Sequence, residues 1–169
     1  MSKNHQKIAI SFFYTLLLLQ LAFADQKTEV IIEGMVYCQS CNHFGSWSLT
    51  DAKPIASSKI SVICKNQWKQ VNYYRGFETD SNGYFFAKLD GFKIGHSILD
   101  HPLQSCKVKL VSSPMENCKL ISNVNYGING AELRFENKVL RRGSDYEAVV
   151  YAAGPLAFRP DRCDPQTNL

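Results

Sequence analysis

The chain has 169 residues, of which 45% are hydrophobic and 20% are charged, with 19 basic and 15 acidic side chains. This composition is typical of a globular protein and excludes a disordered, highly charged tail. Six prolines and ten glycines are too few for a proline-rich polymer or a collagen-like repeat. We therefore expect one folded domain.

The first 24 residues have the pattern of a secretory signal peptide. Two lysines precede a largely apolar run at 8–21, and an Ala-Phe-Ala sequence ends at Ala24. This run is shorter than the roughly 20 residues of a membrane-spanning helix. We predict cleavage after Ala24, a domain at 25–169, an extracellular location and no membrane span after cleavage. An uncleaved signal anchor is the alternative.

Cleavage at this site lowers the net charge. It removes two lysines and no acidic residue, so that 17 basic and 15 acidic groups remain over 145 residues. A protein that binds nucleic acid is expected to show a larger basic excess and a basic stripe. The sequence therefore predicts no nucleic-acid partner.

All six cysteines follow the predicted signal peptide, and an even number in an exported chain predicts three disulfides. Fifteen pairings are possible, and spacing does not choose among them. The Cys38-x-x-Cys41 pair has two other interpretations, a redox dithiol or half of a zinc site with His43. The first requires a βαβ setting and the second another close cysteine pair, and neither is present in the sequence. We expect structural disulfides, no metal and no cofactor. The cysteines are Cys38, Cys41, Cys64, Cys106, Cys118 and Cys163.

Seven short segments are rich in β-branched and aromatic residues, and none after the signal peptide has a sustained helical period. They predict an all-β fold, an antiparallel β-sandwich or barrel of about seven strands stabilised by disulfides. Gly34 marks a bulge or a close approach, and Asn82-Gly83 predicts a hairpin turn. The segments are 30–37, 59–65, 71–78, 84–89, 106–111, 133–135 and 145–151.

Alternation along two of these segments predicts which side chains face the core. In 106–111 the cysteine, valine and leucine share one face, which leaves Lys107 and Lys109 on the other. In 133–135 we expect Leu133 and Phe135 to point inward. Arg142-Gly143 is expected to form an exposed turn.

Several stretches together resemble the pollen Ole e I allergen and extensin family of plants. They are EGMVYCQSC at 33–41, TDSNGYF at 79–85 and CKVKL at 106–110. The sequence GPLAFRP at 154–160, ahead of Cys163, is similar to the cysteine-containing domain of arabinogalactan and proline-rich cell-wall proteins.

This resemblance has implications for the bridges and for the function. It implies that Cys38 pairs with Cys118, Cys41 with Cys163, and Cys64 with Cys106. It also implies an extracellular, wall-associated protein that is not an enzyme, with carbohydrate binding suggested for some domains of this type. It supplies no catalytic residues.

The residues themselves give little support for catalysis. No Gly-x-Ser-x-Gly, His-Glu-x-x-His or phosphate-binding glycine loop is present. His96 and His101 are five residues apart, a spacing that does not focus two imidazoles on one metal, so we interpret them as solvated loop histidines. A protonation response of these residues in an acidic compartment stays open.

Aromatic and basic residues alternate in one part of the chain, and this group is the candidate binding face. Aromatic rings stack on the C–H faces of sugars, and cations meet the carboxylates of pectin. The competing interpretation is that these rings pack in the core. The same two interpretations apply to Trp47, which lies earlier in the chain. The candidate ligand-binding residues are Trp68, Lys69, Tyr73, Tyr74 and Arg75.

We interpret the chain as a secreted cell-wall or apoplast protein that binds wall polysaccharide, such as pectin or galactan, or a glycoprotein. The alternatives are a small secreted hydrolase, a redox protein using Cys38-x-x-Cys41, and a structural or signalling protein with a protein partner.

Overall fold

The computed structural model describes residues 27–93, 98–142 and 146–163. The predicted signal peptide at 1–24, His96 and Gly143 lie outside these ranges. None of the helices in the described part of the chain has the length and apolarity that crossing a bilayer requires.

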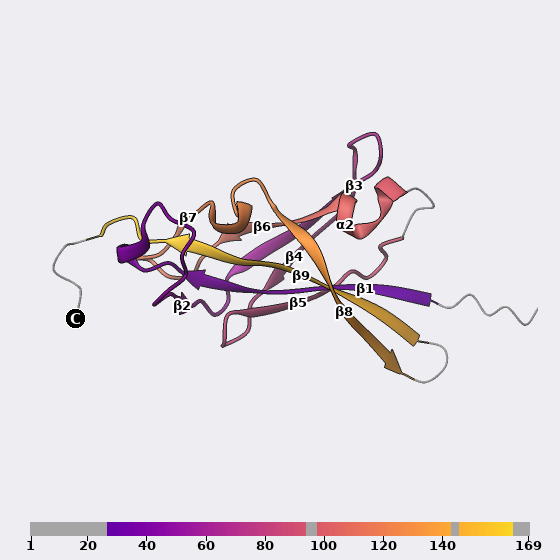
Figure 1. The fold of residues 1–169 in the computed structure, drawn as a ribbon, viewed down its shortest axis with the longest axis horizontal. Helices are drawn as coiled ribbons and strands as arrows, with labels where there is room; N and C mark the ends of the chain where they lie inside the picture. The colour runs from indigo at the N-terminus through magenta and orange to yellow at the C-terminus, as the bar shows by residue number, and fades with distance from the viewer. Residues whose placement is uncertain (1–26, 94–97, 143–145, 164–169) are drawn as a thin grey trace, which may run out of the picture.

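The described residues form an all-β structure in which nine strands make one strongly curled sheet (Figure 1). The strand order is β2-β1-β9-β8-β6-β3-β4, with β5 added to β1 and β7 to β9. The strands are β1 (Lys27–Cys38), β2 (Lys53–Pro54), β3 (Lys59–Lys65), β4 (Val71–Glu78), β5 (Tyr84–Lys88), β6 (Cys106–Ser112), β7 (Leu120–Ile121), β8 (Ala131–Arg142) and β9 (Tyr146–Arg159).

Each of the seven predicted segments overlaps one of the seven longer strands, although 133–135 and 145–151 cover only part of β8 and β9. The two further strands, β2 and β7, have two residues each. Short helices lie in the connections: the 3-10 helices η1 (Cys41–His43), η2 (Ile98–Asp100) and η3 (Val124–Tyr126), and the four-residue helix α2 (Pro102–Ser105). The predicted all-β class is therefore confirmed, with connections that contain isolated helical turns.

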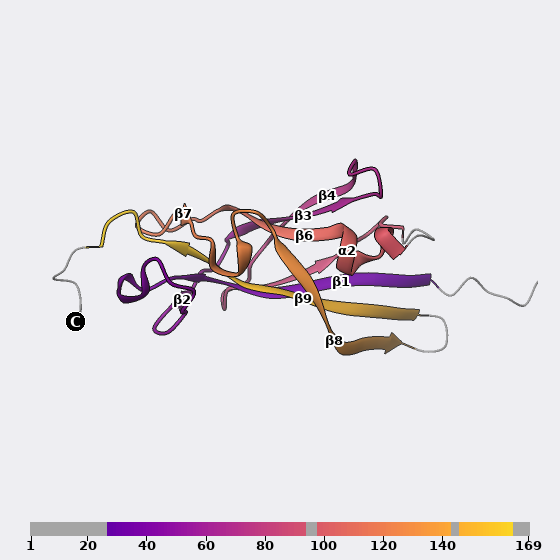
Figure 2. The ribbon, with the colours of Figure 1, turned by 45° about the horizontal axis from the view of Figure 1, so that its top comes forward.

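The sheet folds over on itself into two layers (Figure 2). Strands β3, β4 and β6 form one layer, and β5, β1 and β9 form the other. Strand β8 joins them, because it pairs with β9 along its length and with β6 at Ala131 and Glu132. The core lies between the layers, with the fully buried Val62, Phe85 and Phe158 among its members.

The pairing of β1 with β9 is parallel, whereas the sequence predicted an antiparallel fold. A parallel pair needs a long crossover connection. Most of the described residues lie between the two strands, so the first and last strands of the described part of the chain are neighbours in the sheet.

The Asn82-Gly83 turn is not a hairpin, which corrects the sequence-based prediction. Strand β4 pairs with β3, whereas β5 pairs with β1, so the turn carries the chain from one layer to the other. Gly83 has a φ of 75°, as the Asn-Gly signal indicates, but its carbonyl accepts a 2.8 Å hydrogen bond from the Val36 amide of β1. The positive φ at Gly83 agrees with the prediction, whereas the predicted pairing of the two strands that flank the turn is wrong.

Two predictions about individual side chains have different outcomes. In β6, Val108 and Leu110 are buried and Lys107 and Lys109 face outward, as alternation predicts. In β8, Leu133 is buried but Phe135 is 45% exposed, so the predicted inward pair is wrong for Phe135. Phe135 pairs with the buried Tyr151 and contacts its ring, so it lies on the same face as Leu133, but it stands where the regular register of β8 ends and is not covered.

Candidate functional site

The turn between β3 and β4 presents two of the five predicted ligand-binding residues, Trp68 and Lys69. Asn66 holds this turn, because its side-chain oxygen accepts hydrogen bonds from the amides of Trp68 and Gln70, both at 3.0 Å. Trp68 is 71% exposed. The indole therefore belongs to the surface and not to the core.

The other three predicted residues lie on β4, where the pleat separates them. Tyr73 and Arg75 pair with the inward-facing residues of β3, and Tyr74 pairs with the outward-facing Ile63. Tyr73 packs against the core and meets the ring of Phe92 edge-on at 5.6 Å, whereas Tyr74 is 64% exposed. The structure therefore does not bring the five residues together on one face.

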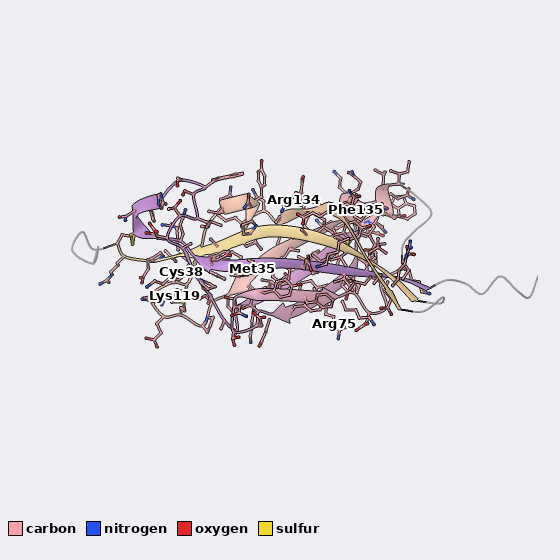
Figure 3. All side chains as sticks on the ribbon, turned by 60° about the horizontal axis from the view of Figure 1, so that its bottom comes forward. Met35, Cys38, Arg75, Lys119, Arg134 and Phe135 are labelled. Carbon is pink, nitrogen blue, oxygen red and sulfur yellow. A yellow bond between two sulfur atoms is a disulfide. The ribbon has the colours of Figure 1, made fainter. Side chains whose placement is uncertain are left out.

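Arg75 has partners of its own at the edge of the sheet. Its Nη1 lies 3.2 Å from the Asp90 carboxylate, and its guanidinium lies over the ring of Phe77. Figure 3 places Arg75 at the opposite side of the view from Arg134 and Phe135. Because Arg75 is already paired, it is a weak candidate for ligand contact.

The outer face of β4, β3 and β6 holds an open groove of about 670 Å³ that extends to α2. Its floor is formed by Ile63 and Val71. The register shift between Cys64 and Lys65 puts Lys65 opposite Val71, so that both side chains face outward. We call this surface the lysine groove; its basic members are Lys65, Lys69, Lys107 and Lys109.

The charge of the lysine groove is only partly balanced. Lys107 lies 3.5 Å from the Glu132 carboxylate. None of the ion pairs among the described residues involves Lys65, Lys69 or Lys109. Three lysines without an acidic partner in that part of the chain therefore surround an apolar floor, which is suited to a polyanion with apolar faces.

A disulfide on the core side of the sheet joins β3 to β6, two of the strands that form the lysine groove. Cys64 of β3 and Cys106 of β6 stand directly opposite each other and are bonded, and both are buried. This bridge holds the register that places Ile63 next to Lys107 and Ser61 next to Lys109.

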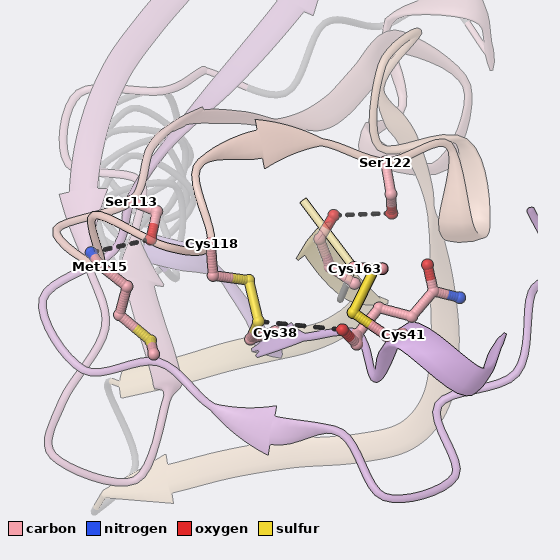
Figure 4. The surroundings of a disulfide bond; sticks show 9 residues. Cys38, Cys41, Ser113, Met115, Cys118, Ser122 and Cys163 are labelled. Atoms are coloured by element: carbon pink, nitrogen blue, oxygen red, sulfur yellow. Dashed lines mark hydrogen bonds between the residues drawn. A yellow bond between two sulfur atoms is a disulfide. The ribbon is translucent and has the colours of Figure 1, made fainter. Parts of the chain in front are cut away.

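The other two bridges lie at the far end of β1, where Figure 4 shows them side by side. Cys38 is bonded to Cys118 and Cys41 to Cys163, and the described residues contain no free cysteine. The three bonds are the pairs that the family resemblance implied. Since Cys38 and Cys41 are bonded to different distant partners, they do not form the dithiol that the redox alternative requires.

The described residues contain no group of three or more histidine, cysteine, aspartate or glutamate side chains that could hold a metal ion. The two described histidines belong to different connections. His43 ends η1, and the Nδ1 of His101 accepts a hydrogen bond from the Leu103 amide at the start of α2. His101 therefore has a capping role at this helix.

A partly buried carboxylate, Glu33, lies on the opposite layer. Glu33 of β1 accepts a 2.7 Å hydrogen bond from the Tyr84 hydroxyl and bonds of 2.9 and 2.7 Å from Lys138 Nζ. Burial raises the pKa of Glu33, but the hydrogen bonds from Lys138 and Tyr84 and the charge of Lys138 outweigh burial, so its pKa lies below the ordinary value. Burial and the Glu33 carboxylate raise the pKa of Tyr84.

This arrangement predicts a pH-dependent contribution to stability. A carboxylate with a lowered pKa stabilises the fold above its unfolded-state pKa of about 4.3, and the stabilisation is lost as the pH falls through the folded-state pKa. We expect Lys138→Gln to lower the free energy of unfolding by about 1 kcal/mol at pH 7. The difference from wild type should shrink below about pH 4, measured by urea unfolding.

Lys119→Gln is the matched control, because Lys119 is exposed and belongs to none of the ion pairs among the described residues. It should leave stability unchanged at both pH values. A Lys138→Gln effect of the same size at pH 3 and pH 7 would contradict the role assigned to Glu33.

The residues that the structure adds to the candidate site are Ile63, Lys107 and Lys109. Alternation in 106–111 correctly indicated that the two β6 lysines face outward. The sequence carried no signal that β3 lies between β6 and β4, and this order is what brings the lysines of β6 next to those of the β3–β4 hairpin.

The fold defines a class: a curled β-sheet protein with three disulfides and an open groove lined by lysines on one layer. No family model matches the chain. The chain is 29% identical over 140 residues to non-classical arabinogalactan protein 30 of Arabidopsis thaliana. The aligned part covers 79% of this chain and 54% of that protein. It is 26% identical to the Olee1-like protein of Betula pendula, and this alignment covers 86% of this chain and 80% of that protein.

The fold also matches a solved structure. The crystal structure of the major plantain pollen allergen Pla l 1 superposes with a TM-score of 0.55 at 25% identity and covers 82% of this chain and 98% of that one. The chain is therefore similar to plant pollen-allergen and cell-wall-type proteins, in agreement with the resemblance to the pollen Ole e I allergen and extensin family.

Some of these relatives are much longer proteins. The chain spans about half of the arabinogalactan protein and less than half of the pistil-specific extensin-like protein of Nicotiana tabacum and of proline-rich protein 3 of Arabidopsis thaliana.

Proposed function

We propose that the chain is a secreted protein of the plant cell wall or apoplast that binds an acidic wall polysaccharide in the lysine groove and catalyses no reaction. The observation that carries this proposal is the group of three lysines, Lys65, Lys69 and Lys109, without an acidic partner among the described residues, beside the apolar floor of one open groove. The signal-peptide pattern and the cell-wall relatives support the location.

The shape of the lysine groove favours a chain-like ligand. It is open, it crosses three strands, and it continues to α2 through Gln104 and Lys107, which also line a second hollow of about 460 Å³. A polyuronate such as de-esterified pectin carries a carboxylate on every sugar ring and offers apolar C–H faces to Ile63 and Val71. A rigid strand surface meets it with little loss of conformational entropy.

The test is calorimetric titration of the oxidised protein with polygalacturonate, fully methyl-esterified pectin and galactan. We expect binding to polygalacturonate that weakens as sodium chloride is raised, because exposed charges are screened. The variant Lys65→Gln, Lys69→Gln, Lys109→Gln should bind polygalacturonate about tenfold more weakly or worse, since each lost contact contributes about 0.5–1 kcal/mol.

The control removes the same charge elsewhere. Lys53, Lys93 and Lys119 are exposed and do not line the lysine groove, so the corresponding triple glutamine variant should bind as wild type does. Equal losses in the two variants would mean that net charge and not the groove attracts the polymer. Binding of galactan with no binding of polygalacturonate would replace the acidic ligand with a neutral one.

A further inference from the structure

A separate hollow, of about 290 Å³, lies at the end of the molecule that carries β7 and η1, opposite the β3–β4 turn and α2 along the long axis (Figure 1). We call it the aromatic pocket. Two rings stand at its rim: Phe44 is 55% exposed and Trp47 is 53% exposed. Its other apolar lining residues are Ile121, Val124 and Ile128.

The aromatic pocket is held in shape by hydrogen bonds and a disulfide. The buried Gln39 side chain donates to the carbonyls of His43, Ser46 and Ser48 at 3.0, 2.9 and 3.0 Å, and so fixes the loop that carries Phe44 and Trp47. Cys41, at the start of this loop, is bonded to Cys163 beyond β9 (Figure 4). The pocket is therefore formed before any ligand arrives.

Its two aromatic side chains also have fixed orientations. Trp47 meets the ring of Tyr126 edge-on, with 5.0 Å between ring centroids, which leaves an indole face open. The guanidinium of Arg159 lies 4.4 Å from the centroid of the Phe44 ring. This cation–π contact positions the guanidinium beside the pocket, where its N–H groups can donate to a planar acceptor.

Arg159 is the one charged residue in the lining of the aromatic pocket. None of the ion pairs among the described residues includes it. The pocket therefore offers one fixed positive charge with no acidic partner in that part of the chain, and it is complementary to one negative charge on a ligand.

The neutral polar side chains of the pocket are mostly committed to the protein itself. Gln39 Nε2 donates to the three loop carbonyls, Ser46 Oγ donates to the His43 carbonyl, and Ser122 Oγ donates to the Ala157 carbonyl at 2.7 Å. A sugar needs many partners for its hydroxyl groups, and of the neutral polar side chains that line the pocket only Asn123 lies outside these bonds. An apolar ring that carries one anionic group would be complementary to the aromatic lining and to the Arg159 guanidinium.

We propose that the aromatic pocket binds a small aromatic carboxylic acid, with the ring against Trp47 and the carboxylate on the Arg159 guanidinium. The volume of about 290 Å³ is just below the range of about 300–1,000 Å³ that small-molecule sites occupy, which favours a ligand with a single ring. The site is separate from the lysine groove and does not depend on the proposed polysaccharide binding.

The test uses trans-cinnamate as the probe and cinnamyl alcohol as its uncharged analogue. Trp68→Phe leaves Trp47 as the single tryptophan, so its indole N–H resonance reports directly on the aromatic pocket. We expect cinnamate to shift this resonance and to give a saturable calorimetric titration, whereas cinnamyl alcohol binds at least about tenfold more weakly, since a charged hydrogen bond is lost.

Arg159→Gln should weaken cinnamate binding by about tenfold and leave polygalacturonate binding unchanged. Arg134→Gln is the control, because Arg134 is exposed and lies outside the aromatic pocket, and it should leave cinnamate binding unchanged. Equal affinity for cinnamate and cinnamyl alcohol, or no response of Trp47 to cinnamate, overturns the proposal. A Trp47 shift with methyl galactoside and none with cinnamate overturns it in favour of a sugar.

Discussion

Gly34→Ala should lower the free energy of unfolding by about 3 kcal/mol or prevent folding, the largest effect that we expect from one methyl group in this protein. A Cβ at position 34 would meet the carbonyl oxygen of Ala153 and the ring of Phe85. The carbonyl belongs to the backbone of β9 and Phe85 is fully buried, so neither moves without breaking the pairing of β1 with its neighbours. Urea unfolding followed by circular dichroism measures the change.

Gly76→Ala is the matched control in β4. A Cβ there has its nearest neighbour, the Ile60 carbonyl oxygen, at 3.8 Å, which is ordinary van der Waals contact. Alanine also reduces the entropy of the unfolded chain, so this variant should be as stable as wild type or up to about 1 kcal/mol more stable. If the two variants lost stability equally, the effect at Gly34 would come from strand flexibility and not from the close approach of β1 to β9.

Replacing both Cys64 and Cys106 by alanine should lower the free energy of unfolding by roughly 4 kcal/mol on the loop-entropy model. The bridge closes a loop with a sequence separation of 42, and both residues are buried in the core. The variant should also bind polygalacturonate less well under native conditions, because the β3–β6 register that spaces Ile63 and Lys107 loses its covalent constraint. Urea unfolding and calorimetry measure the two effects.

Mild reduction of the wild-type protein gives an independent check on the same bridge. Cys163 is exposed, whereas Cys64 and Cys106 are buried, and thiol-disulfide exchange requires access to a sulfur. Alkylation and mass spectrometry should therefore find Cys41 and Cys163 reduced first, with the fold retained. Reduction of Cys64–Cys106 should coincide with unfolding. A stability loss below about 1 kcal/mol in the double alanine variant would show that strand pairing alone holds this register.

The positions of the longer strands were predictable because they depend on short-range composition. Segments such as 59–65 and 71–78 are dense in β-branched and aromatic residues, and β3 and β4 have these bounds in the structure. The second half of β8 was missed, since it contains Lys138 and Arg141 rather than alternating apolar residues. It is a strand because its backbone pairs with β9.

The candidate site was predictable only in part. The segment containing Trp68 and Lys69 does border the lysine groove, and the exposure of Trp68 agrees with a surface role. Tyr73 and Tyr74 were grouped because they are adjacent in sequence, but adjacent residues in a strand point to opposite faces. Which of the two faces the core depends on the neighbouring strand, and this information is not in the local sequence.

The sequence by itself determined the properties that depend on local residue types and motifs. These are the all-β class, the places where strands form, the positive φ at Gly83 and the family resemblance. The tertiary structure decided which strands are neighbours, and with this the parallel β1–β9 pair, the crossing of the Asn82-Gly83 turn between layers and the meeting of Lys65 with Lys109 in one groove. The physical reason is that strand pairing is a contact between segments far apart in the chain. The free energy of strand pairing comes from burying the apolar faces of the two layers against each other. This contribution depends on residues from both layers and cannot be read from any short stretch of sequence.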